Sequence, residues 1–233
     1  MKLFLRLTLI FLLAAPALHA ASDCLATTGG VSLTLPAPAG GIVEVGADKR
    51  DYFAYMVPDT TRLLCAFVPS GILPGLTSPA RGLGRYMLVE VSRRAEAATQ
   101  EISASDFAEV IASVKQQIGD GTTLAKTAQS SSEEATRKLR EMGDSKGISI
   151  QQITPLGVIF QSPDAYAVAM ASPVTSGGVA SQVLNASVLL RVRGRLLFVY
   201  LYADGGDEAS LNWLKTVAGE WTRQILSYNP PLQ

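Results

Sequence analysis

Three acidic residues around a glycine pair are the first candidates for chemistry. Asp204, Asp207 and Glu208 surround Gly205-Gly206, and carboxylates so close together could hold a hard cation such as Ca²⁺. The competing explanation is structural, because acidic residues in such a place often cap the next helix and complement its dipole. We favour the structural explanation, and the sequence predicts no metal ion and no cofactor.

Two shorter motifs resemble fragments of catalytic or phosphate-binding sites. Thr123 and Lys126 have the Thr-x-x-Lys spacing of a hydroxyl–lysine pair, but the companion motifs of such enzymes are absent. Gly82-Leu83-Gly84 has part of a glycine-rich phosphate loop, without its third glycine or a helix directly after it. An ordinary helix surface and a flexible turn explain these residues better, so neither motif predicts a catalytic residue.

The inventory of residue types excludes several chemistries. The single histidine is His19, within a segment that we interpret below as a signal peptide. Without it the chain can form neither a Ser-His-Asp nor a Cys-His centre, and no histidine-containing zinc site. Two cysteines cannot form a four-thiolate site. We therefore expect no enzymatic activity, and keep as the alternative a hydrolase that uses carboxylates or a Ser/Thr–Lys pair.

Alternating arginines form the one candidate for a partner-binding surface. Arg191, Arg193 and Arg195 surround a predicted hairpin tip and could bind an anionic partner or a lipid headgroup. Trp213, on the last predicted helix, could contribute to a partner surface as well. The competing explanation, which we favour for the arginines, is a charged hairpin tip that discourages pairing between sheet edges.

The N-terminal segment has the build of a secretory signal peptide. Lys2 and Arg6 precede an apolar run over 7–15, and small residues follow it up to a predicted cleavage site after Ala20. The sequence therefore predicts a bacterial protein that is exported to the periplasm or secreted.

Export would place the two cysteines in a compartment where disulfides form. Cys24 and Cys65 are an even pair in a chain that we expect in an oxidising compartment, so we predict a disulfide between them. Closing a loop of this size would stabilise the fold by at most about 4 kcal/mol. Two independent thiols, with Cys65 buried in an apolar strand, are the alternative.

The remaining chain, 21–233, has the length of one domain. Its charge gives no general attraction to nucleic acid, because 20 basic and 20 acidic residues cancel in the full sequence. The longest apolar run outside the leader, 183–203, is interrupted by three arginines, so we predict no transmembrane segment after cleavage.

Apolar periodicity predicts an α+β fold. Alternating or continuous apolar runs predict strands over 30–35, 42–45, 62–68, 85–92, 148–153, 158–161, 166–171, 188–192 and 196–202. Apolar stripes predict helices over 103–118, 122–142 and 207–228. We expect loops over 70–84 and 173–180 and a hairpin turn at Arg193-Gly194. A tight register there would place Leu196 and Phe198 on the side of Val188 and Leu190.

Because several strands are apolar on both sides, we expect helices on both faces of the sheet. The predicted architecture is a layered α/β/α sandwich with a mainly antiparallel sheet and the C-terminal helix packed on it.

The closing hairpin and helix, from Arg191-Val192-Arg193-Gly194-Arg195 to Leu214, resemble the end of PsbP-like α/β/α sandwich domains. The segments RLLCAFVP, LGRYMLVEV and ISASDF add a resemblance to uncharacterised exported proteins of proteobacteria. This resemblance implies a protein-binding or accessory role and provides no catalytic residues. The segment 122–142 and the candidate disulfide depart from the family pattern.

Together these observations predict a non-catalytic module that binds an unknown protein partner in the cell envelope. A carrier of a lipid or small apolar ligand is a further possibility, on the condition that the sandwich encloses a cavity.

Overall fold

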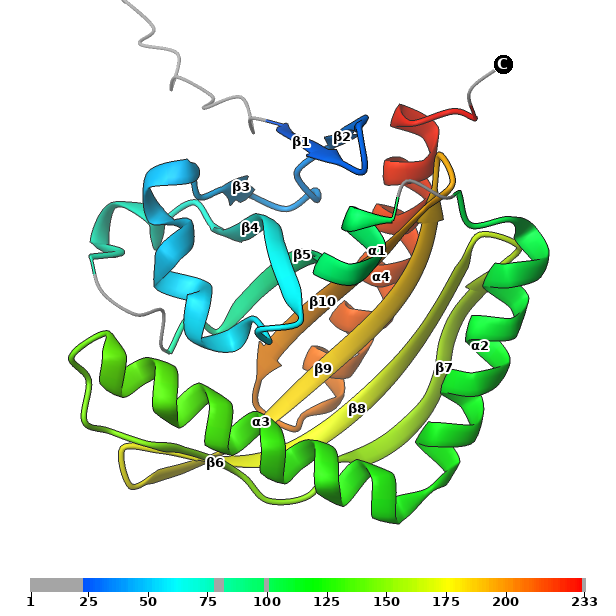
Figure 1. Cartoon of the computed structure of the whole chain (residues 1–233). Coiled ribbons are helices and arrows are strands. Elements are labelled where there is room, and N and C mark those ends of the chain that lie inside the picture. Colours follow the sequence, from blue (N-terminus) through cyan, green and yellow to red (C-terminus); the bar gives the residue numbers. More distant parts are fainter. Residues whose placement is uncertain (1–22, 78–81, 99–100, 232–233) are drawn as a thin grey trace, which may run out of the picture.

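The computed structural model describes residues 23–77, 82–98 and 101–231, so the predicted signal peptide lies outside the described residues (Figure 1). The strands are β1 (Cys24–Thr28), β2 (Val31–Leu35), β3 (Ile42–Glu44), β4 (Thr61–Pro69), β5 (Arg85–Ser92), β6 (Ile148–Ile150), β7 (Thr154–Ser162), β8 (Ala165–Ser176), β9 (Val179–Val192) and β10 (Arg195–Asp204). The helices are the 3₁₀ segments η1 (Ala47–Met56) and η2 (Leu73–Gly75), and α1 (Arg93–Ala97), α2 (Ala104–Gly119), α3 (Gly121–Glu141) and α4 (Glu208–Tyr228).

One antiparallel sheet organises the molecule. Its strand order is β3-β4-β5-β10-β9-β8-β6, and β7 pairs with the first half of β8. The strands on either side of the helical segment 93–141 meet at the centre, where β5 pairs with β10. This confirms the predicted α+β sandwich with a mainly antiparallel sheet.

Helix α4 covers one face of the sheet (Figure 1). The alanine side of β8 faces this helix, since Ala165 and Ala167 belong to the same buried cluster as Leu214, Trp221 and Ile225. Small side chains on the strand let a helix approach closely. The predicted apolar stripe of the C-terminal helix is therefore confirmed as the contact that buries this face.

The opposite face is covered by three helices in turn. Apolar residues of α2, among them Phe107 and Val114, pack on Tyr166 and Leu189. Segment η1 packs Phe53 against the β4–β5 end of the sheet. Helix α3 bridges the space between them and packs against η1 and β6 (Figure 1).

The structure corrects the expected register of the closing hairpin. The two-residue turn at Arg193-Gly194, with φ of 48° and 70°, pairs Val192 directly with Arg195. Directly paired residues share a face, so Leu197 and its alternating successors lie on the side of Leu190. The prediction that put Leu196 and Phe198 there was wrong by one residue, which moves Tyr200 and Tyr202 to the α3 side of the sheet.

Two expected breaks in the chain are strand instead. The predicted loop over 173–180 is the end of β8, a Gly177-Gly178 turn and the start of β9, paired as far as Ser176 with Val179. Thr154 and Pro155, expected to separate two strands, lie inside β7. Pro155 is tolerated because β7 occupies an edge, where a missing N–H leaves no strand partner unsatisfied.

The N-terminal segment is a small hairpin, β1–β2, that the sequence did not predict in full. The predicted disulfide joins Cys24 of β1 to Cys65 of β4, with a Cα–Cα distance of 6.3 Å. Asn229, just after α4, holds the other strand: its side chain pairs with the backbone N–H and C=O of Thr34 at 2.9 and 2.7 Å. The hairpin is thus fastened to both the sheet and the C-terminal helix.

Within the part of the chain that the structure describes, no helix combines the length and apolar character required to cross a membrane.

Candidate functional site: a cavity beneath helix α3

A cavity of about 440 Å³ lies between α3 and the sheet. Its size is within the range of sites that bind small molecules. Much of its wall is apolar, with contributions from η1, β6 and β8: Met56, Ile148, Ile150, Met170 and Val174. Tyr86, Tyr200, Tyr202 and Glu90 contribute from β5 and β10, on the face that the hairpin register assigns to them.

Hydroxyl groups of α3 fasten one side of the cavity roof to strand β6. Ser132 Oγ accepts a 2.8 Å hydrogen bond from the Ile150 N–H, and Thr136 Oγ1 accepts one of 3.0 Å from the Ile148 N–H. Four helical residues span about 6 Å and two strand residues about 6.6 Å, so the two spacings match. Helix α3 is continuous through the serine run at 130–132, and the last serine of that run, Ser132, docks it on β6.

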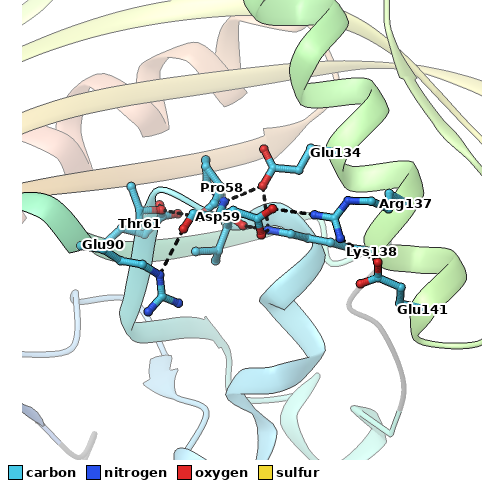
Figure 2. A network of polar contacts seen from close by, with 10 residues as sticks. Pro58, Asp59, Thr61, Glu90, Glu134, Arg137, Lys138 and Glu141 are labelled. Atoms are coloured by element: carbon cyan, nitrogen blue, oxygen red, sulfur yellow. Dashed lines mark hydrogen bonds and ion pairs between the residues drawn. The ribbon is translucent and has the colours of Figure 1, made fainter.

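A charged network fastens the other side of the roof to the loop before β4 (Figure 2). The Lys138 ammonium lies 2.9 Å from Asp59 Oδ1 and 2.9 Å from Glu134 Oε1, and it donates to the Val57 carbonyl. The Asp59 N–H also donates to Glu134 Oε1, at 2.5 Å. The hydrogen bond from Lys138 holds the pKa of Asp59 below its ordinary value.

Arg137 extends this network on the solvent side. Its guanidinium lies 2.6 Å from Asp59 Oδ2 and 2.7 Å from Glu141 Oε1 (Figure 2). These exposed pairs contribute less than the Lys138 contacts, because water screens them.

Glu90 places a carboxyl group at the inner end of the network. It is 1% exposed, and within the described residues its hydrogen-bond partner is the Thr61 hydroxyl, which donates to Oε2 at 2.7 Å. Burial raises the pKa of Glu90 to about 7, and the Thr61 hydrogen bond and the Lys138 charge offset part of that rise.

The Thr61 hydroxyl can respond to the protonation of Glu90. It also lies 3.1 Å from the Pro58 carbonyl, and a hydroxyl has one proton to donate. The Thr61 hydroxyl donates to Glu90 when the carboxylate is ionised. When Glu90 is protonated, the carboxyl group can donate to the Thr61 oxygen, and the Thr61 hydroxyl can then donate to the Pro58 carbonyl. Figure 2 shows this contact continuing, through the Pro58–Asp59 segment, to α3.

Tyrosine side chains surround the carboxyl group on the floor of the cavity. The rings of Tyr86 and Tyr202 stack with centroids 4.6 Å apart, and the Tyr200 ring lies 6.4 Å from that of Tyr202. Burial raises the pKa of each of these three phenols, so they are neutral hydrogen-bonding groups at physiological pH. The arrangement is a mainly apolar space with one buried acid and several neutral hydroxyls, suited to binding rather than to nucleophilic chemistry.

The acidic residues proposed for a cation have structural roles. Asp207 caps α4, since its Oδ1 accepts a 2.8 Å hydrogen bond from the Ser210 N–H, and Glu208 lies in the first helical turn. Asp204 Oδ2 accepts from the Gly84 N–H at 3.2 Å. Within the described residues no three or more Asp, Glu, Cys or His side chains gather as metal ligands.

The two short motifs also lie away from the cavity floor. The Thr123 hydroxyl donates to Asp120, the cap of α3, at 2.6 Å, and Lys126 is exposed on the same helix. Gly82-Leu83-Gly84 leads into strand β5 with Leu83 buried, so no helix N-terminus follows it.

The three arginines do not converge on one surface. Arg191 pairs with Asp164 in the β7–β8 turn, while Arg193 donates to the Pro230 and Ser32 carbonyls, both at 3.1 Å. Arg195 is 9% exposed and lies against Gly29 of the β1–β2 turn. Trp213 is half-buried on α4 beneath the Arg85 guanidinium, 4.8 Å from the ring centroid. The partner surface suggested for these four residues stays a prediction.

Sequence reasoning missed the cavity, although one signal for it was present. Glu90 alternates with Tyr86 and Leu88 on one side of a strand, and Asn185 and Ser187 interrupt an otherwise apolar strand in the same way. Polar residues at inward positions of a two-sided apolar sheet mark a place where the face is not filled by a helix.

Comparison with known proteins leaves the chain without a family. No family model matches it, and no curated protein matches it. Two solved structures are similar in outline. A point mutant of the protein Mog1 has 11% identity and a TM-score of 0.32, and the match covers 89% of this chain and 93% of that one. The Ran-binding protein Mog1p of Saccharomyces cerevisiae has 12% identity and a TM-score of 0.30, and the match covers 90% of this chain and 93% of that one. Similarity at this level carries no argument about what this chain binds. The resemblance to PsbP-like domains stays a prediction.

Proposed function

We propose that this chain is an exported, non-catalytic binding module that holds a small, mainly apolar ligand in the cavity beneath α3. The observation that carries the proposal is the cavity itself, about 440 Å³ with apolar walls and a few polar groups on its floor. Export rests on the N-terminal sequence pattern. A protein partner in the cell envelope, expected from the resemblance, is compatible with this role, since a carrier must deliver its ligand.

The hydrolase alternative gains less support from the same geometry. Glu90 and Glu134 both line the cavity, but Glu134 Oε1 is already engaged by Lys138 and by the Asp59 N–H. Glu90 has the Thr61 hydroxyl as its hydrogen-bond partner, and the same hydroxyl lies within hydrogen-bond distance of the Pro58 carbonyl in the preceding loop. This arrangement does not resemble a nucleophile activated by a neighbouring base. We therefore favour binding over catalysis.

Adjacent serines of α3 provide a matched test. Ser131 lines the cavity, whereas the adjacent Ser130 is exposed to solvent and is not among the lining residues. Ser131→Phe should fill the space from the roof, and Ser130→Phe should leave it open. Native mass spectrometry of protein purified from its own cells, and titration with the neutral dye N-phenylnaphthylamine, measure occupancy.

We expect saturable 1:1 dye binding by the wild type and by Ser130→Phe, and binding weakened about ten-fold or more by Ser131→Phe. Absence of dye binding by the wild type, or equal affinities of all three proteins, would contradict the proposed function.

A further inference from the structure

We infer that the cavity beneath α3 selects organic cations, namely an ammonium group carried on an apolar body. The inference rests on the proposed function and adds the chemical class of the ligand. The side chains that line the cavity include two carboxylates, Glu90 and Glu134, and among the described residues no lysine or arginine.

The two carboxylates differ in how far their charge is already compensated. Glu134 is paired with the Lys138 ammonium at 2.9 Å, and Lys138 is in turn shared with Asp59 and the Val57 carbonyl (Figure 2). The Lys138 ammonium, which is not part of the cavity lining but whose charge also acts on Glu90, is therefore already held by three acceptors. Within the described residues, the hydrogen-bond partner of Glu90 on the cavity floor is the neutral Thr61 hydroxyl, at 2.7 Å.

Most of the groups that face Glu90 from the neighbouring elements are neutral hydroxyls, and the one cation that acts on it, Lys138, is already paired with carboxylates. Strand β10 contributes Tyr200 and Tyr202, strand β5 contributes Tyr86, and η1 contributes Tyr55 to the same lining. Thr61 on β4 completes the surroundings of the carboxyl group. On α3, Glu134 and Lys138 are the charged residues on this side, and they neutralise each other.

A buried charge is costly unless a partner of opposite sign compensates it. An ammonium group in the cavity would pair with Glu90 and lie among aromatic rings, whose negative faces attract cations. A carboxylate or phosphate ligand would instead meet a second negative charge and, among the lining residues that the structure describes, no basic side chain. Charge thus discriminates between ligands of similar size and apolar content.

Protonation of Glu90 adds a second, independent signature. Burial raises the pKa of this carboxyl to about 7, so a bound cation must compete with a proton near neutral pH. Affinity for a permanent cation should therefore rise between about pH 6 and about pH 8, by up to about ten-fold. A neutral alcohol of the same length should show no such rise.

The test is displacement of N-phenylnaphthylamine by four probes that share one alkyl chain: decyltrimethylammonium, decylamine, decanol and decanoate. Wild-type protein should bind both cations about ten-fold or more tightly than decanol, and decanoate more weakly than decanol. Glu90→Gln should reduce the preference for cations to about two-fold or less and abolish its pH dependence. Glu133→Gln, which removes an exposed carboxylate from the outer side of α3, should retain both.

Two failures are distinguishable. If the dye does not bind to the wild type, the proposed function is wrong. If the dye binds but no cation displaces it, or decanol or decanoate displaces it as well as the cations do, the cavity binds apolar ligands without selecting cations and this inference is overturned. The wild-type series decides this without any variant, so a Glu90→Gln protein that fails to fold does not weaken the test.

Discussion

At the scale of single residues, Glu90 is the feature that separates this sheet from an ordinary core. Its strand places it on the face with Tyr86 and Leu88, where a leucine or valine would bury more apolar surface at lower cost. A carboxyl group with 1% exposure and the Thr61 hydroxyl as its partner destabilises the folded state whenever it is ionised. Such a cost is most readily understood if the group serves a ligand.

We predict that Glu90→Gln makes the protein more stable above neutral pH. The pKa of about 7 in the folded state exceeds the value of 4.5 expected for an unfolded chain, so folding favours the protonated form. The stability that this group contributes is fully present below about pH 4.5 and is lost as pH rises through about 7. The separation of the two pKa values corresponds to about 3 kcal/mol at most.

Urea unfolding of Glu90→Gln and wild type between about pH 5 and about pH 8 measures this difference. The free energy of unfolding of the variant should gain on the wild type as pH rises. Glu133→Gln, at an exposed position, should run parallel to the wild type. Parallel curves for Glu90→Gln would show that its carboxyl does not titrate near neutrality.

At the scale of elements, α3 is a roof fastened along both sides. Ser132 and Thr136 bind the backbone of β6, and Lys138 binds the loop before β4. Its apolar contacts are few, with Ala135 and Leu139 packed on Tyr55. A helix held mainly by polar contacts at its sides can cover a face without filling it.

We predict that Lys138→Ala loosens this roof. The side chain is 13% exposed and contacts Asp59, Glu134 and the Val57 carbonyl, so its loss should cost about 2 kcal/mol. Amide hydrogen exchange in α3 should quicken more than in β9 and β10. Lys126→Ala, on the exposed side of the same helix, should change stability by less than about 0.5 kcal/mol. Equal rates of amide exchange in α3 for both variants would show that Lys138 does not fasten the helix.

The β1–β2 hairpin depends on a side chain distant in sequence. Asn229 replaces a strand partner for Thr34, accepting from its N–H at 2.9 Å and donating to its C=O at 2.7 Å, and is itself 3% exposed. Asn229→Ala should lower the free energy of unfolding by about 2 kcal/mol, because it leaves both backbone groups unpaired. Asn212→Ala, exposed on α4, is the control, and equal unfolding curves for the two variants would contradict this role.

At the scale of the whole molecule, the disulfide ties the start of the chain to the central sheet. Cys24 and Cys65 enclose a sequence separation of 41 residues. Replacing both by alanine should cost about 2 to 4 kcal/mol, mostly by freeing the unfolded chain. A thiol assay on the denatured, unreduced protein should find no reactive thiol. Two reactive thiols, or an unchanged melting temperature in the double variant, would contradict the cross-link.

Local pattern was enough to predict the layers of this fold but not the cavity between them. The apolar runs over 85–92 and 166–171 predicted strands that the structure contains as β5 and β8, and the apolar stripe over 207–228 predicted the helix that covers one face. The prediction of the hairpin register was wrong because the register depends on which residues the turn at Arg193-Gly194 pairs. A shift of one residue in this pairing exchanges the two faces of the strand.

The position of α3 could not be predicted, because its narrow apolar stripe does not specify which face it covers or at what distance. That position depends on contacts between residues far apart in sequence, such as Lys138 with Asp59 and Thr136 with Ile148. The candidate residues with visible motifs turned out to be caps and turns, as with Asp207 and Thr123. The residues around the cavity have ordinary local sequences, and they form a site only because the fold brings them together.

The most direct test of a ligand-holding cavity is to locate a bound molecule. Backbone amide resonances of isotopically labelled full-length protein, followed during titration with N-phenylnaphthylamine, report where it sits. We predict shifts at Ser131, Ser187 and Tyr200, which line the cavity from α3, β9 and β10, and unchanged resonances at Lys215 and Glu220 on the exposed side of α4. Shifts confined to α4 or to the Arg193 hairpin tip, or no shifts at all, would contradict the account.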